Sequence, residues 1–122
     1  MIPIRVLLVD DNVAFRHRMS RMLALQDDLL VVGEAKDGVE AIARARELQP
    51  DVVLMDFRMS GMDGFTAARS ILEEQPHVKV LILTAYPGAL DAEKVVRSGL
   101  AGLLLKDRPA EEIVTAIRKS VA

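Results

Sequence analysis

Four points along the chain carry polar side chains that together could handle a phosphoryl group. Each point ends or directly follows a short aliphatic run, and the residues are Asp10 with Asp11, Asp56, Thr84 and Lys106. Carboxylates without histidine or cysteine favour Mg²⁺, which combines carboxylates and waters with a phosphate oxygen. An ammonium and a hydroxyl would neutralise and hold the transferring group, whose charge spreads over three oxygens. Asp56 could then act as the nucleophile and form an acyl phosphate.

Each of these residues also has an ordinary structural interpretation. An aspartate after a strand often forms a turn or caps a helix, which would account for Asp56 and for the pair Asp10 and Asp11. Thr84 would be a common strand residue, and Lys106 a solvated residue near the start of a helix. Their coincidence at four strand ends favours one shared chemical site over four separate explanations.

Five aliphatic runs alternate with five stretches of helical periodicity, and these elements must position the polar residues. The runs predict buried strands at 4–9, 29–32, 51–55, 78–83 and 103–105. The other stretches predict amphipathic helices, with Asp11 or Asn12 capping the first, Asp37 the second, Asp63 or Gly64 opening the third, and Asp107 capping the last. Gly99 is expected to end the fourth helix in a left-handed conformation.

This alternation, with short connections, predicts an α/β fold of three layers in which helices cover both faces of a parallel sheet. Right-handed crossovers favour the flavodoxin-like (βα)5 arrangement with strand order 2-1-3-4-5. In that order the first and third strands are neighbours, about 4.8 Å apart. Asp10, Asp11 and Asp56 should therefore share one crevice at the carboxyl edge of the sheet, where their mutual repulsion calls for a cation.

Length and composition narrow the functional classes. A chain of 122 residues, 51% of them hydrophobic, is expected to form one domain over residues 1–122. The net charge of -2 argues against a nucleic-acid-binding surface, because Arg16, Arg18 and Arg21 fit the solvated face of one helix. The absence of cysteine excludes disulfides and thiolate chemistry and suits the cytoplasm. We expect neither a signal peptide nor a membrane span.

The chain resembles the receiver domain of two-component response regulators, and within that family the transcription factors of the LuxR/FixJ (NarL-like) type. The motifs that carry the resemblance are Leu8-Val9-Asp10-Asp11-Asn12, Leu54-Met55-Asp56-Phe57-Arg58-Met59, Gly61-Met62-Asp63-Gly64, Leu83-Thr84-Ala85 and Leu104-Leu105-Lys106-Asp107. Their spacings are compatible with the family over essentially the whole chain.

The resemblance implies that a histidine kinase transfers phosphate from phosphohistidine to Asp56, and that the domain catalyses only its own phosphorylation and dephosphorylation. The implied roles are Mg²⁺ binding by Asp11, Asp56 and the backbone carbonyl of Arg58, with Asp10 acting through water, and a grip on the phosphoryl group by Lys106 and Thr84. It further implies a switched surface, a homodimer on phosphorylation, and a DNA-binding output domain in a longer chain, while this domain itself contacts neither nucleic acid nor membrane.

The chain departs from the family pattern at positions that matter for switching. Leu103 stands three residues before Lys106, where an aromatic residue is usual, so the coupling between that residue and Thr84 is open. Ser60 replaces a common proline in the loop after Asp56. Arg58 lies beside the expected phosphoryl site, where it could affect hydrolysis of the acyl phosphate.

Three other functions stand as alternatives. A receiver-like interaction module that has lost phosphate switching would fit Leu103 but not the intact set of site residues. A phospho-aspartyl hydrolase would need an acid–base aspartate two residues after the nucleophile, where the chain has Arg58. A flavin carrier on the same fold would need a Ser/Thr/Gly phosphate loop in place of Asp10-Asp11-Asn12.

Overall fold

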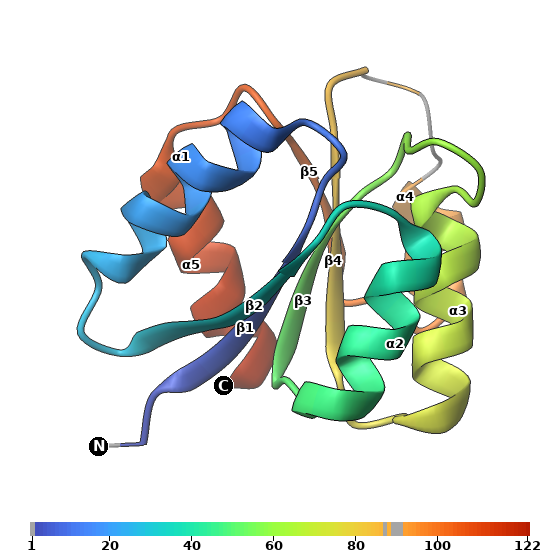
Figure 1. Cartoon of the computed structure of the whole chain (residues 1–122), viewed down its shortest axis with the longest axis horizontal. Coiled ribbons are helices and arrows are strands. Elements are labelled where there is room, and N and C mark those ends of the chain that lie inside the picture. The colour runs from blue at the N-terminus through green and yellow to red at the C-terminus, as the bar shows by residue number, and fades with distance from the viewer. Residues whose placement is uncertain (1, 87, 89–91) are drawn as a thin grey trace.

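In a computed structural model of the chain, the described residues, which are 2–86, 88 and 92–122, form a parallel sheet between two layers of helices (Figure 1). The strands are β1 (Ile4–Val9), β2 (Leu29–Ala35), β3 (Val52–Asp56), β4 (Lys79–Thr84) and β5 (Gly102–Leu105). The helices are α1 (Val13–Ala24), α2 (Gly38–Leu48), α3 (Gly64–Glu74), α4 (Ala92–Arg97) and α5 (Ala110–Val121). All neighbouring strands are parallel, in the order β2-β1-β3-β4-β5. The predicted flavodoxin-like α/β fold is confirmed.

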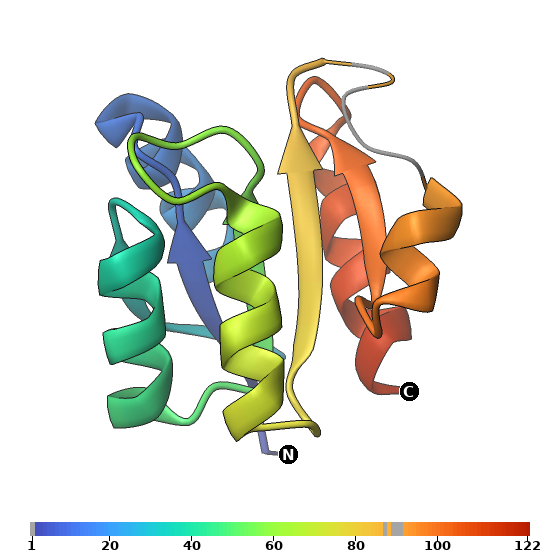
Figure 2. The ribbon, with the colours of Figure 1, turned by 90° about the vertical axis from the view of Figure 1, so that its right-hand side faces the viewer.

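The helices divide unequally between the two faces of the sheet. α1 and α5 cover one face, and α2, α3 and α4 cover the other (Figures 1 and 2). Successive side chains of a strand point to opposite faces, so on β3 Val52 and Leu54 join the cluster under α1 and α5. Val53 and Met55 join the cluster under the other three helices. Burial on both faces explains why the inner strands are continuous aliphatic runs in the sequence.

Short polar side chains cap three of the helices. The capping residues are Asn12, Asp37 and Asp63, each accepting a hydrogen bond from a backbone N–H three residues further on. The cap of α1 is therefore Asn12, and the Asp11 carboxylate is not used for it. The prediction that Asp107 caps the last helix is wrong. The N-cap position of α5 is Pro109, so Asp107 lies two residues too early in the chain to bond to the first turn.

β2 extends three residues beyond the predicted strand. Gly33, Glu34 and Ala35 pair with the second half of β1, after an irregularity in the register. Gly33 and Glu34 are poor strand formers, but a parallel ladder is built from backbone groups and tolerates them at an edge. A side chain at Gly33 would meet Leu48 of α2, because an added Cβ would lie 2.5 Å from Leu48 Cδ1. The glycine thus lets α2 pack closely on this strand.

The described helices are short. The longest, α1 and α5, contain 12 residues each. Within the described ranges, no helix combines the length and the apolar character needed to cross a membrane.

Candidate functional site

The strand register brings the predicted residues to one edge of the sheet. The last pair of the β1–β3 ladder directly precedes Asp10 and Asp56, so these two residues end neighbouring strands. Thr84 ends β4, which lies on the other side of β3. Lys106 follows β5, and its backbone N–H donates a hydrogen bond to the Thr84 carbonyl at 2.8 Å. Four separate stretches of sequence therefore meet here, while their roles in chemistry stay predictions.

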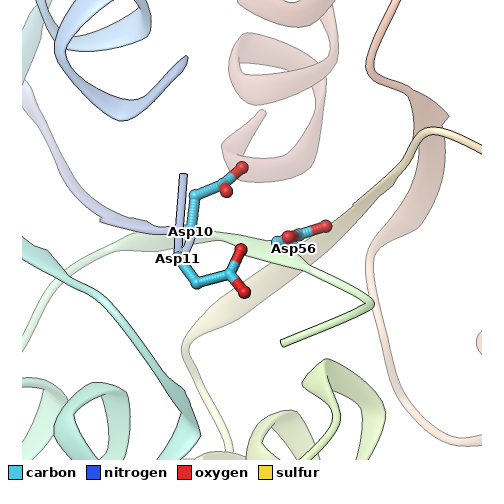
Figure 3. A group of neighbouring side chains, drawn as sticks. All are labelled: Asp10, Asp11 and Asp56. Carbon is cyan, nitrogen blue, oxygen red and sulfur yellow. The ribbon is translucent and has the colours of Figure 1, made fainter. Parts of the chain in front are cut away.

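Three aspartates form the centre of this group. Asp10, Asp11 and Asp56 each offer a carboxylate oxygen, and these oxygens all lie within 4.8 Å of one another (Figure 3). Asp10 and Asp56 are buried, with 3% and 5% of their surface exposed, whereas Asp11 is exposed. Charged groups at this spacing repel one another, and burial removes the water that would screen them. The arrangement therefore favours a positive charge among the three carboxylates.

The donor set fits a hard divalent cation. The three groups supply oxygen ligands of the kind that Mg²⁺ prefers. Asp10 Oδ1 accepts a hydrogen bond from the Asn12 backbone at 2.9 Å. Asp10 Oδ2 forms an ion pair with Lys106 Nζ at 2.6 Å and accepts no hydrogen bond from any described residue. A metal cation or its bound water would share this buried oxygen with the Lys106 ammonium.

Lys106 supplies one positive charge to the site. Its Nζ lies 2.6 Å from Asp10 Oδ2 and 3.4 Å from Asp56 Oδ2, and 17% of its side chain is exposed. The ammonium is thus closer to Asp10 than to Asp56. One ammonium facing three carboxylates leaves the site with an excess of negative charge, which again suits a divalent cation.

Burial makes Asp56 a weaker acid. Loss of hydration and, to a smaller extent, the negative charge of Asp10 together raise the pKa of its carboxyl to about 6, although Lys106 acts in the opposite direction. Asp11 also raises this pKa, to a smaller extent. A nucleophilic aspartate must be ionised, so additional positive charge in the site would favour its reactive form.

Thr84 is buried at the end of β4, and its hydroxyl is engaged by the next loop. Oγ1 accepts a hydrogen bond from the Tyr86 backbone N–H at 3.1 Å and donates one to the Tyr86 carbonyl at 3.4 Å. The hydroxyl would have to leave these partners to bind a group on Asp56. Its predicted contact with a phosphoryl group therefore requires the hydroxyl to give up its bonds to the Tyr86 backbone.

Arg58 lies in the loop between β3 and α3, with its side chain directed to another loop. Its guanidinium carbon is 4.6 Å from the centre of the Tyr86 ring, a cation–π distance, and both side chains are exposed. The side chain thus spans the loops that follow β3 and β4. The predicted role of the Arg58 backbone carbonyl as a ligand stays a prediction.

Leu103 occupies the position of the expected aromatic residue. It is half-buried in β5 and packs against the aliphatic cluster that includes Val95 and Leu100. A leucine has no hydroxyl to exchange between a pocket and solvent. A threonine–aromatic coupling of the expected kind therefore has no counterpart at this position.

Arg16 is a neighbour of the site that the sequence did not distinguish. Its Nη1 donates to the Asp10 carbonyl at 2.7 Å, and its Nε pairs with Glu34 at 2.7 Å. Only 14% of its side chain is exposed, so the interpretation of Arg16 as part of a solvated helix face is wrong. Periodicity places Arg16 on the same helix as Arg18 and Arg21 but does not show that β2 supplies a carboxylate to it. The one available signal, the acidic residue Glu34, lies beyond the predicted strand at 29–32.

Comparison with known proteins places this chain in a family. Residues 6–118 match the profile of the response regulator receiver domain. The response regulator protein VraR is 42% identical over 118 residues in Staphylococcus saprophyticus and 41% identical over 117 residues in Staphylococcus aureus. These matches cover 97% and 96% of this chain and 56% of each relative, so the chain spans about half the length of the curated relatives it matches.

Solved structures agree with this match. The signal receiver domain of NarL from Mycobacterium tuberculosis is 36% identical, with a TM-score of 0.91 and coverage of 99% of this chain and 98% of that one. A LuxR-family DNA-binding response regulator from Staphylococcus aureus is 27% identical, with a TM-score of 0.88 and coverage of 97% and 98%. These matches show that the chain belongs to the family of response regulator receiver domains.

Proposed function

We propose that residues 1–122 form a receiver domain that accepts a phosphoryl group on Asp56 from a histidine kinase, in a reaction that depends on Mg²⁺. The observation that carries this proposal is the position of Asp56, whose buried carboxylate lies within 4.8 Å of those of Asp10 and Asp11 and 3.4 Å from Lys106 Nζ. Membership of the receiver family supports it. The domain would act catalytically only on its own phosphorylation and dephosphorylation.

In the proposed reaction, a carboxylate oxygen of Asp56 attacks the phosphorus atom of a phosphohistidine. The bond between phosphorus and nitrogen breaks, its electron pair returns to the imidazole, and an aspartyl phosphate forms. The Lys106 ammonium lies 3.4 Å from the attacking carboxylate and would offset negative charge on the phosphoryl oxygens. The ion pair with Asp10 keeps this ammonium in the site before transfer.

The metal ligands that we propose are the carboxylates of Asp11 and Asp56 and the Arg58 carbonyl, with Asp10 acting through water. When bound, Mg²⁺ supplies neutralising charge to the carboxylates and to the phosphoryl oxygens. Its binding also favours the ionised, nucleophilic form of Asp56.

Thr84 would couple phosphorylation of Asp56 to a change elsewhere in the domain. Its hydroxyl, which is bonded to the Tyr86 backbone, would turn to donate a hydrogen bond to the phosphoryl group. The backbone at Tyr86 would then lose this anchor and rearrange. This rearrangement would change a partner-binding surface, promote a homodimer and control a DNA-binding output domain in a longer, cytoplasmic protein.

A small phosphodonor tests the proposal without the kinase. Incubation with acetyl phosphate and Mg²⁺ should add one phosphoryl group to the intact mass of the wild-type chain, and none to the Asp56→Asn variant. Asp107→Asn is the matched control, since Asp107 is an exposed aspartate next to Lys106 in sequence. It should be phosphorylated like the wild type. An unmodified wild-type chain would favour the alternative of an interaction module that has lost phosphate switching.

The hydrolase alternative receives no support from the site. Such an enzyme needs an acid–base group two residues after the nucleophile, and that residue is Arg58, whose side chain stacks on Tyr86. A guanidinium stays protonated and cannot act as a general base.

A further inference from the structure

Phe15, in the first turn of α1, contacts the amine of the candidate site. Lys106 Nζ lies 4.4 Å from the centre of the Phe15 ring, a distance typical of a cation–π interaction. The ring packs against the aliphatic cluster under α1 and α5, and the lysine side chain is largely buried. Cation–π interactions are stronger where both partners are shielded from water.

Hydrogen bonds fix the turn of α1 that carries this ring. The Phe15 backbone N–H donates to the capping Asn12 side chain at 2.9 Å. The next residue, Arg16, ties the same turn to the Asp10 carbonyl and to Glu34 of β2. The first turn of α1 is thus fixed relative to the carboxylates and presents the ring to the ammonium.

Lys106 needs such a support because it reaches the site from β5, which is two strands away from β3. Its four-carbon side chain has many rotamers, and its charged partners are Asp10 and Asp56. Both partners change during the proposed reaction, since Asp56 becomes an acyl phosphate and a cation would compete for Asp10. The face of a neutral ring keeps its attraction for the ammonium throughout.

We infer that Phe15 is a positioning residue that holds the Lys106 ammonium beside Asp56 during phosphoryl transfer. This role rests on the proposed function. It differs from the ordinary role of a helix residue packed in the core, because it acts through Lys106 and should disappear when Lys106 is replaced.

The first test needs no phosphoryl transfer. Lysine acetylation by an N-hydroxysuccinimide ester, followed by peptide mass spectrometry, compares Lys106 with the exposed Lys119 of the same chain. Phe15→Leu should raise the relative labelling rate of Lys106 by roughly three- to tenfold. Phe15→Tyr, which keeps an aromatic face, should leave it unchanged. Phe65→Leu is the matched control, because Phe65 makes a similar contact with a different lysine, Lys94, at 5.0 Å. This variant should leave the labelling rate of Lys106 unchanged.

The second test is a double-mutant cycle on the rate of phosphorylation by acetyl phosphate with Mg²⁺. Phe15→Leu should slow the reaction roughly three- to tenfold when Lys106 is present and should have no effect in the Lys106→Ala background. Phe15→Tyr should restore the rate. Equal slowing in both backgrounds would show a structural role only and would overturn the inference.

The two tests separate the possible failures. A wild-type chain that is never phosphorylated would contradict the proposed function, whereas the labelling experiment would still decide whether Phe15 restrains Lys106. Unchanged labelling in Phe15→Leu would overturn the inference even if phosphorylation proceeds. If Phe15→Leu does not fold, as judged by urea unfolding, Phe15→Met serves in both tests.

Discussion

The ionisation of the Asp56 carboxyl group should make the stability of the fold depend on pH. Burial and the neighbouring Asp10 raise its pKa to about 6, from 3.8 in water, while Lys106 acts against them. The folded state therefore binds this proton more tightly than the unfolded state does. Stability must then fall as the pH rises from about 4 to about 6, because the folded chain alone bears the cost of ionising Asp56.

This effect predicts a difference between wild type and Asp56→Asn in the absence of Mg²⁺. Across that pH range the wild type should lose about 2 kcal/mol of unfolding free energy relative to the variant, since one pKa unit corresponds to about 1.4 kcal/mol. Urea unfolding at several pH values measures it. Parallel pH profiles for the two chains would show that Asp56 is not perturbed by burial.

Addition of Mg²⁺ should offset part of this loss. At neutral pH, Mg²⁺ at ten times its dissociation constant should stabilise the wild type by about 1.4 kcal/mol. Thermal unfolding followed by circular dichroism should show a smaller gain in Asp56→Asn and in Asp11→Asn. Asp107→Asn serves as the control for nonspecific salt effects and should respond like the wild type. An equal gain in all four chains would argue against a metal site at these aspartates.

At the scale of elements, the junction of β3 and α3 sets the position of Asp56. Gly64 begins α3 directly against the strand, and a Cβ added to it would lie 2.1 Å from the Asp56 carbonyl oxygen. Such a contact cannot be relieved by rotating a side chain, because the atom that it meets belongs to the backbone. The helix or the strand end must move instead.

Gly64→Ala should therefore destabilise the fold by about 2–3 kcal/mol. Gly61→Ala is the natural comparison, since Gly61 has a φ of +81° but nothing within 4 Å of an added Cβ. It should lose about 1 kcal/mol through backbone strain alone. Urea unfolding of both variants measures the two costs, and a Gly64→Ala variant no less stable than Gly61→Ala would contradict the close packing.

The helix caps provide a second comparison between elements. Asn12→Ala should cost about 1 kcal/mol of unfolding free energy, because the side chain satisfies a backbone N–H of α1. Asp107→Ala should cost little, since Asp107 lies outside the cap position of α5. A larger loss for Asp107→Ala than for Asn12→Ala would contradict the positions of the two helix starts.

These helix starts also show where local sequence signals fail. A polar residue before an apolar stripe indicated a cap at both Asn12 and Asp107, and only the first is correct. The sequence between Lys106 and Pro109 is compatible with more than one starting residue for α5. The choice depends on how α5 packs against the sheet, which local composition does not determine.

At the scale of the whole molecule, the fold was predictable because its determinants are repeated along the chain. Aliphatic runs alternate with helical periodicity, and a parallel sheet places all strand ends that carry polar residues at one edge. The grouping of Asp10, Asp56, Thr84 and Lys106 follows from this topology, without knowledge of any side-chain contact.

The contacts between side chains were not predictable in the same way. The sequence does not show that Lys106 lies closer to Asp10 than to Asp56, or that Phe15 lies under its ammonium. Nor does it show that Arg16 pairs with Glu34. Each of these contacts depends on how a helix is rotated and how far it lies along the sheet, and residue types at a given spacing fit several such placements.

The central claim, that Asp56 is the phosphoryl acceptor, is tested most directly by locating the modified residue. After treatment with acetyl phosphate and Mg²⁺, borohydride should reduce the aspartyl phosphate to homoserine, and tandem mass spectrometry should find homoserine at position 56. A control without phosphodonor should retain aspartate there. Homoserine at another aspartate, or at none in a folded chain, would contradict the account.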